Sequence, residues 1–286
     1  MRRFVVIMSA ALFFCAMILG HSAVAAENIP IFVSIVPQKY FVKKIGGELV
    51  KVSIMVKPGA SPATYEPKPG QMVALSRAKV YYAIGVPFEK VWLRKIIAAN
   101  PGLLIVHTES GIEKAPMKPD QPEGIKDPHV WLSPPLVMVQ ARNILNALLK
   151  VDPKNASIYE SNYRKFIVEL VVLDAELRGV FSGRGKNIKF MVFHPAWGYF
   201  ARAYGLKMIP VENEGKDPKP AALRRLIEKA REHGINVVFV QPEFSTKSAG
   251  TIAKAIGGQV VFASPLAADW TNNLKQVAVK FKAALR

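Results

Sequence analysis

The feature that most constrains the fold is an uninterrupted stretch in the middle of the chain, residues 154–181, which contains no proline and one glycine. Apolar side chains recur in it at alternating spacings of four and three residues, the pattern of one buried stripe along an α-helix. The stripe consists of Tyr159, Tyr163, Phe166, Leu170, Leu173, Leu177 and Val180. About 28 residues at a 1.5 Å rise predict a helix roughly 42 Å long, which can span two domains. A coiled-coil dimer is less favoured, because the stripe mixes aromatic and aliphatic residues over only about three heptads.

Strand and helix patterns alternate on both sides of this helix. The predicted strands are residues 31–36, 50–56, 80–84 and 103–106, then 190–193, 207–211, 237–240 and 260–262. The predicted helices include residues 38–45, 71–78, 88–99 and about 274–285. Such alternation is typical of parallel sheets with helices on their faces. We therefore predict an α/β fold of two similar lobes with parallel sheets, joined by a long rigid central helix, with a ligand cleft between the lobes.

The first residues have the pattern of a cleavable export signal. Arg2 and Arg3 precede an apolar run over residues 4–19, and Ala23-Val24-Ala25 is a small-residue cleavage motif. We expect residues 1–25 to be a signal peptide that sends the chain to the periplasm. The remaining organisation is then an N-terminal lobe over residues 26–153, a linking helix over 154–182 and a C-terminal lobe over 183–286.

Composition limits the classes of partner that the protein can bind and the residue types available for a metal site. The formal net charge is +18, but the lysines are scattered along predicted helices without an arginine and aromatic cluster. We therefore expect a solvated basic surface on a monomer, and no nucleic-acid partner. The single cysteine, Cys15, lies in the signal segment, so any metal site must use His, Asp or Glu.

His129 lies in a conformationally restricted segment, residues 127–135. Pro128 restricts the backbone of the residue before it, and residues 130–132 are expected to form a short buried strand. Ser133 followed by Pro134 has the pattern of a helix N-cap and first turn. A histidine held this firmly ahead of a helix suits a metal ligand.

His194 is the second candidate ligand, because it directly follows the predicted strand 190–193. Ligands of α/β proteins bind at the loops that follow the carboxyl ends of parallel strands. The loops expected to line a cleft between the lobes are residues 58–69, 127–133, 194–197, 212–217, 241–245 and 264–269. His107 is expected on the surface, and His233 fits the last turn of a helix, where a cation complements the helix dipole.

The sequence contains no motif of covalent or phosphate chemistry. It has no G-x-S-x-G elbow, no Gly-rich phosphate loop and no His-Glu-x-x-His pair. We therefore do not expect an enzyme. A periplasmic metallohydrolase with two histidines, one carboxylate and an open water position stays as an alternative.

Three motifs together give a resemblance that covers nearly the whole chain after the signal segment. They are Pro62-Ala63-Thr64-Tyr65-Glu66-Pro67, Asp127-Pro128-His129-Val130-Trp131-Leu132-Ser133-Pro134, and Phe193-His194-Pro195-Ala196-Trp197-Gly198-Tyr199-Phe200. The chain resembles the zinc/manganese-type solute-binding proteins of ABC importers. The resemblance implies capture of a divalent transition metal in the periplasm, with zinc favoured and manganese as the alternative, and delivery to an ABC permease in the inner membrane.

The resemblance also implies a ligand set that is incomplete in this chain. His129 and His194 match two of the four usual ligand positions, whereas the other two hold Ala63 and Ser264. If the second sheet has strand order 2-1-3-4, the loop with Glu243 lies between His194 and Ser264, so Glu243 is the preferred third ligand.

Other carboxylates remain open as replacements, namely Glu212, Glu214 and Glu66. A further alternative is a receptor of the same fold that binds a metal chelate or a small anion. A site that lacks two protein ligands can have changed the molecule it binds, and the basic charge suits an anion.

Overall fold

The computed structural model describes residues 28–117, 123–183, 188–212, 216–244 and 246–285. The strands of the first sheet are β1 (Ile29–Val33), β2 (Val50–Ile54), β3 (Val80–Ala83) and β4 (Leu104–His107), and those of the second are β5 (Ile188–Val192), β6 (Leu206–Pro210), β7 (Val237–Val240) and β8 (Gln259–Phe262). Both sheets are parallel, with orders β2-β1-β3-β4 and β6-β5-β7-β8. The predicted fold class and the 2-1-3-4 strand order are therefore confirmed.

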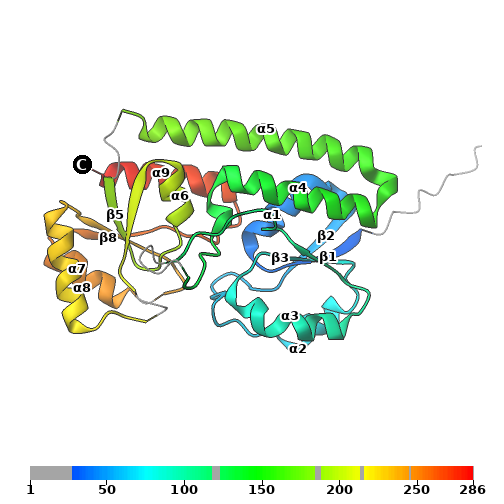
Figure 1. The fold of residues 1–286 in the computed structure, drawn as a ribbon, viewed down its shortest axis with the longest axis horizontal. Coiled ribbons are helices and arrows are strands. Elements are labelled where there is room, and N and C mark those ends of the chain that lie inside the picture. Colours follow the sequence, from blue (N-terminus) through cyan, green and yellow to red (C-terminus); the bar gives the residue numbers. More distant parts are fainter. Residues whose placement is uncertain (1–27, 118–122, 184–187, 213–215, 245, 286) are drawn as a thin grey trace, which may run out of the picture.

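Helices connect the strands and cover the sheets (Figure 1). They are α1 (Val36–Gly46), α2 (Pro69–Leu75), α3 (Pro87–Ala99), α4 (Pro134–Val151), α5 (Ala156–Phe181), α6 (Gly198–Ala203), α7 (Pro220–Glu232), α8 (Lys247–Ala255) and α9 (Trp270–Ala284). Helices α2, α3, α4 and α7 each start with proline, whose fixed φ suits the first helical turn. The predicted strands and helices differ from the observed ones mainly at their ends.

Helix α5 runs along both lobes as one element of 26 residues (Figure 1). It packs against α1 and α4 of the first lobe and against α9 of the second. The residues on its buried face are Tyr159, Phe166, Leu170, Leu173, Leu177 and Phe181. The stripe found in the sequence is therefore the face that joins the two lobes.

Tryptophans tie the lobes together directly at the junction. Trp131 Nε1 donates to the carbonyl of Pro265 at 2.8 Å, and Trp270 Nε1 donates to the carbonyl of Trp131 at 2.8 Å. Trp270 also packs edge-on against Phe41, with ring centroids 5.0 Å apart. These residues belong to one hydrophobic cluster that includes side chains of both sheets. Because the two lobes share a core, the loops between them are held in a fixed relation.

One local prediction was wrong. Residues Val130–Leu132 form a 3-10 turn and not a short strand, although all three are buried as expected. The turn is closed by hydrogen bonds from Val130 N to Pro128 O and from Leu132 N to His129 O. Three apolar residues between Pro128 and Pro134 are buried in the lobe junction, where no strand lies beside them to pair.

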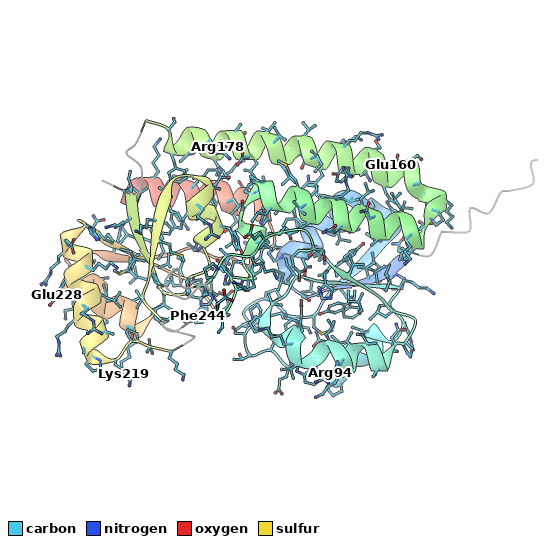
Figure 2. The ribbon with its side chains drawn as sticks, viewed as in Figure 1. Arg94, Glu160, Arg178, Lys219, Glu228 and Phe244 are labelled. Carbon is cyan, nitrogen blue, oxygen red and sulfur yellow. The ribbon has the colours of Figure 1, made fainter. Side chains whose placement is uncertain are left out.

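The outer surface carries most of the charge. Arg94, Glu160, Lys219 and Glu228 lie on the outside, whereas Phe244 lies where the two lobes meet (Figure 2). Within the described ranges, no helix combines the length and the apolar character that a membrane span needs. Residues 1–25, predicted as the signal peptide, lie outside the described residues.

The tryptophan contacts predict a stability effect. Replacing Trp270 with Phe removes the donor to Trp131 O and leaves a buried carbonyl without its partner. We expect the free energy of unfolding, measured by urea denaturation, to fall by about 1–3 kcal/mol. Trp92, which is partly exposed on α3, provides the matched Trp92→Phe control. Equal losses in the two variants would contradict the account.

Candidate metal centre

His129 is oriented by the acidic residue two positions before it. Asp127 Oδ1 lies 2.9 Å from the backbone nitrogen of His129 and 2.7 Å from its Nδ1. Both groups point to one carboxylate oxygen because Pro128 turns the chain between them. Asp127 is only 3% exposed. The ring of Trp131 lies 5.1 Å from the imidazole. His129 therefore has a fixed ring plane, with Nε2 directed away from Asp127.

His194 follows β5 and is oriented by three residues from other loops. The Gln241 side chain accepts from His194 N at 3.2 Å and donates to His194 O at 2.8 Å. Glu212 Oε1 lies 2.6 Å from His194 Nδ1, and the ring of Phe244 stacks on the imidazole at 4.7 Å. The second sheet thus presents His194 Nε2 toward the first lobe.

The two imidazoles meet with their Nε2 atoms 3.2 Å apart. A carboxylate only accepts hydrogen bonds, so each Nδ1 beside Asp127 and Glu212 carries the hydrogen. In the neutral rings both Nε2 atoms then present lone pairs to each other. Such a pair is stabilised only by an added proton or by a cation between the nitrogens.

The distance fits a tetrahedral metal ion. With Zn–N bonds of about 2.0–2.1 Å, two ligands at the tetrahedral angle lie roughly 3.3–3.4 Å apart. Burial lowers the pKa of His194, and the hydrogen bond to Glu212 only partly opposes this. Neutral imidazole, the form that binds metals, is therefore favoured at His194. A carboxylate behind each metal-binding imidazole is also the usual outer shell of a zinc site.

The pair opens into a cavity of about 450 Å³ between the lobes. The residues lining it are Ser61, Pro62, Ala63, Gly85, Val86, Pro87, Lys90, Lys114, Met117, Gly124, Ile125, Lys126, Pro128, His129, Trp131, His194, Glu243, Phe244, Pro265 and Leu266. Five of the six loops predicted to line the cleft contribute to it. The sixth reaches the pair from behind, through Glu212.

The replacement ligands proposed from the sequence have different positions. Glu243 lines the cavity beside His194, and its Oε2 is buried without a hydrogen-bond partner among the described residues. Burial raises the pKa of Glu243, and a hydrogen bond from its own backbone N–H only partly opposes this. Glu212 lies behind His194 and not in the cavity, and Glu66 is exposed away from it. Glu214 lies outside the described residues.

The described residues contain no group of three or more His, Asp or Glu already placed to hold one metal ion. Ser264, at one of the usual ligand positions, has its Oγ engaged by the backbone nitrogen of Leu266 at 3.3 Å. His107 is exposed and pairs with Glu109, and His233 lies beside Lys189. The structure thus brings together His129 and His194, and separates the other described histidines from them.

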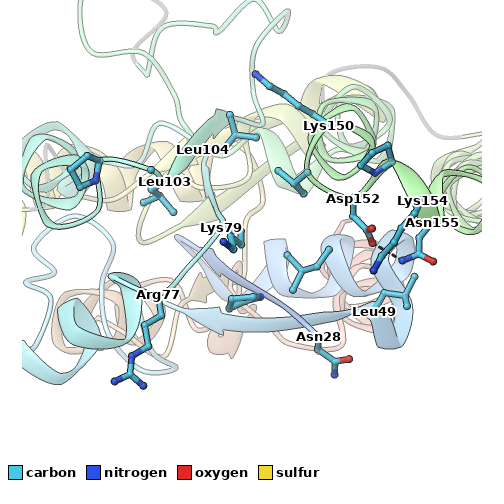
Figure 3. A pocket seen from close by; sticks show the side chains of 16 residues that line it. Asn28, Leu49, Arg77, Lys79, Leu103, Leu104, Lys150, Asp152, Lys154 and Asn155 are labelled. Carbon is cyan, nitrogen blue, oxygen red and sulfur yellow. Dashed lines mark hydrogen bonds between the residues drawn. The ribbon is translucent and has the colours of Figure 1, made fainter. Parts of the chain in front are cut away.

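A second cavity, of about 950 Å³, opens near the amino ends of the first sheet's strands (Figure 3). Its charged lining is Arg77, Lys79, Lys150, Lys154 and Asp152. Asp152 already accepts from Asn155 and Tyr159. Without a histidine or a second carboxylate, this cavity lacks the donors of a transition-metal site.

Sequence reasoning missed the orienting roles of Asp127, Glu212 and Gln241. Asp127 had a local signal, since Asp side chains often accept from the backbone N–H two residues later. Glu212 was considered only as a metal ligand. Gln241 had no signal, because its contact with His194 forms between neighbouring strands far apart in the sequence.

Known proteins of similar sequence and structure identify the family of this chain. Residues 31–284 match the family described as "ZnuA: Zinc-uptake complex component A periplasmic". "High-affinity zinc uptake system protein ZnuA" of Bacillus subtilis (strain 168) is 26% identical over 254 residues, 84% of this chain and 79% of that protein. "Iron-binding protein YfeA" of Yersinia pestis is 29% identical over 221 residues, 76% of this chain and 70% of that protein.

A solved structure is similar over nearly the whole described fold. The "Crystal structure of 138-173 ZnuA deletion mutant plus zinc bound" superposes with a TM-score of 0.86 at 46% identity, covering 91% of this chain and 98% of that chain. The family match covers far more than half of the chain. The chain therefore belongs to the ZnuA family, the periplasmic metal-binding receptors of ABC importers, which are solute-binding proteins and not enzymes.

Proposed function

We propose that this chain captures zinc with the Nε2 atoms of His129 and His194 and delivers it to an ABC permease in the inner membrane. The observation that carries the proposal is the imidazole pair, 3.2 Å apart, with a carboxylate behind each ring. The cleavable signal over residues 1–25, the periplasmic location it implies and the monomeric state belong to the same proposal.

Glu243 is the proposed third ligand. Its buried Oε2 has no hydrogen-bond partner among the described residues, and a buried carboxylate oxygen needs either a donor or a cation. Glu243 and His194 line the same cavity, so this carboxylate is the acidic side chain available there to a metal on the histidine pair. Water or another small ligand then fills the remaining position, since Ala63 offers no donor atom.

Zinc is favoured over manganese by the donor set. Two imidazoles, one carboxylate and an open position suit tetrahedral zinc, whereas manganese prefers more oxygen ligands. The names of the relatives point to zinc and to iron, and the similar solved structure is described as having zinc bound. Manganese is retained as the alternative cargo.

The metal content of the protein tests this proposal. We expect the protein purified without chelator to hold about one zinc per chain, measured by mass spectrometry of the metal. His194→Ala should weaken zinc binding by on the order of 100-fold or more in competition with a chromophoric chelator, because one of two imidazole ligands is lost. His233→Ala is the matched control and should bind zinc as the parent does. The proposal fails if both variants retain the same zinc affinity.

The carboxylate behind His194 predicts a smaller effect. Glu212→Gln keeps the shape of the side chain but removes its negative charge. That charge makes the imidazole a stronger electron-pair donor to the metal. We expect zinc affinity to fall by about 10-fold, at the low end of the range for such outer partners. Glu232 pairs with His233 at 3.9 Å outside the site, so Glu232→Gln is the control. An unchanged affinity in Glu212→Gln would refute this role.

The third ligand is tested by Glu243→Gln, which keeps the volume and removes the anionic oxygen. We expect zinc affinity to drop by roughly 10-fold. The thermal unfolding temperature of the metal-free protein should not fall, because the buried Oε2 has no hydrogen-bond partner among the described residues. A zinc affinity equal to that of the parent would exclude Glu243 as a ligand.

A further inference from the structure

The cavity beside the histidine pair is much larger than a metal ion needs. Its volume of about 450 Å³ lies within the range of small-molecule sites, roughly 300–1,000 Å³. Ala63, at one wall, leaves open a position from which a longer side chain would reach inward. The space next to the metal is therefore suited to a second ligand of molecular size.

Basic side chains outnumber acidic ones among the described lining residues of the cavity. Lys90 lies on α3, and Lys114 and Lys126 lie on the connection that follows β4; we call these three the lysine rim. Glu243 is the one acidic side chain among the described lining residues. A divalent metal at the histidine pair adds further positive charge. An anion between the metal and the rim would compensate both.

Lys114 is held in place by neighbouring polar groups. Its Nζ contacts Ile84 O at 3.3 Å and Glu109 Oε1 at 3.5 Å, and its side chain is 20% exposed. The ammonium lies against Gly85, where a Cβ atom would come within 2.2 Å of it. An ammonium has three hydrogens, so these two long contacts leave donor capacity for an anion.

The remaining walls are apolar, which favours an organic anion over an inorganic one. They include Pro62, Val86, Met117, Ile125, Phe244 and Leu266. A hydrated inorganic anion would leave these walls in contact with water, whereas a carbon skeleton would cover them.

We propose that the protein takes up its metal together with a small organic di- or tricarboxylate. This inference rests on the proposed function, because it places the metal on His129 and His194. One carboxylate fills the open coordination position, and a second carboxylate is bound by Lys90 and Lys114. The carbon skeleton lies against the apolar walls. The cargo is then a metal–carboxylate complex and not the bare ion.

Equilibrium dialysis tests whether the protein binds a carboxylate together with zinc. Labelled citrate, malonate and pyridine-2,6-dicarboxylate are each dialysed against the protein, with and without one equivalent of zinc. We expect at least one of the three to be retained at about one per chain only when zinc is present. Acetate, which lacks a second carboxylate, should not be retained. If the protein binds zinc but retains none of the three, the inference is wrong while the proposed function stands. If it binds no zinc, the proposed function itself fails.

Variants of the lysine rim distinguish carboxylate binding in the cavity from a general effect of the protein's positive charge. The double variant Lys90→Gln and Lys114→Gln should lose carboxylate retention by roughly tenfold or more and keep its zinc content, because it loses charge-assisted hydrogen bonds. The matched control, Lys165→Gln and Lys229→Gln, removes two exposed lysines on α5 and α7 and should retain the carboxylate. Equal retention in both double variants would overturn the assignment to the rim.

A substitution at Ala63 should also prevent carboxylate binding, but by adding a competing metal ligand. Ala63→His adds an imidazole at the wall of the cavity, where it would occupy the position that the carboxylate takes. We expect this variant to bind zinc at least as tightly as the parent and to retain little citrate. Unchanged carboxylate retention beside bound zinc would contradict a shared coordination position.

Discussion

The structure depends on two nitrogen lone pairs that face each other across the lobe junction. Asp127 and Glu212 fix the hydrogens on the far sides of the rings, so His129 and His194 meet at 3.2 Å with no hydrogen between their neutral forms. Two neutral acceptors at this distance repel each other. The fold tolerates the contact because the rings are anchored from different lobes, and in the proposed function a metal ion would convert the repulsion into coordination.

That anchoring explains the architecture around the site. Helix α5 packs on both lobes, and Trp131 and Trp270 exchange hydrogen bonds across the junction within a shared hydrophobic cluster. A flexible hinge would let the rings separate and lose the spacing that suits a tetrahedral ion. Since the turn that carries Trp131 starts beside His129, the same contacts stabilise the junction and position one proposed metal ligand.

Much of this was predictable from local sequence patterns. Periodicity identified the linking helix and the strands, and the rule that ligands bind after parallel strands selected His194. The restricted segment around Pro128 selected His129, although residues 130–132 turned out to be a 3-10 turn, because three apolar residues suit either conformation. These features depend on residues close together in the chain.

The rest depends on contacts between distant segments, which one sequence does not reveal. Gln241 meets His194 only because β7 lies beside β5, and the lysine rim combines a residue of α3 with two residues of the connection after β4. The replacement of two usual ligand positions by Ala63 and Ser264 was visible, but the cavity that Ala63 leaves was not. In our proposal, the incomplete ligand set and the basic cavity are therefore two aspects of one site, in which an external anion takes the place of protein ligands.

X-ray absorption at the zinc edge of the zinc-loaded protein measures directly which atoms bind the metal. We expect two imidazole ligands at about 2.0 Å, with oxygen as the remaining atoms bonded to zinc. The imidazole signal should disappear in a variant carrying both His129→Ala and His194→Ala. A zinc spectrum without imidazole scattering, or one unchanged in that double variant, would contradict the claim that these two facing rings hold the metal.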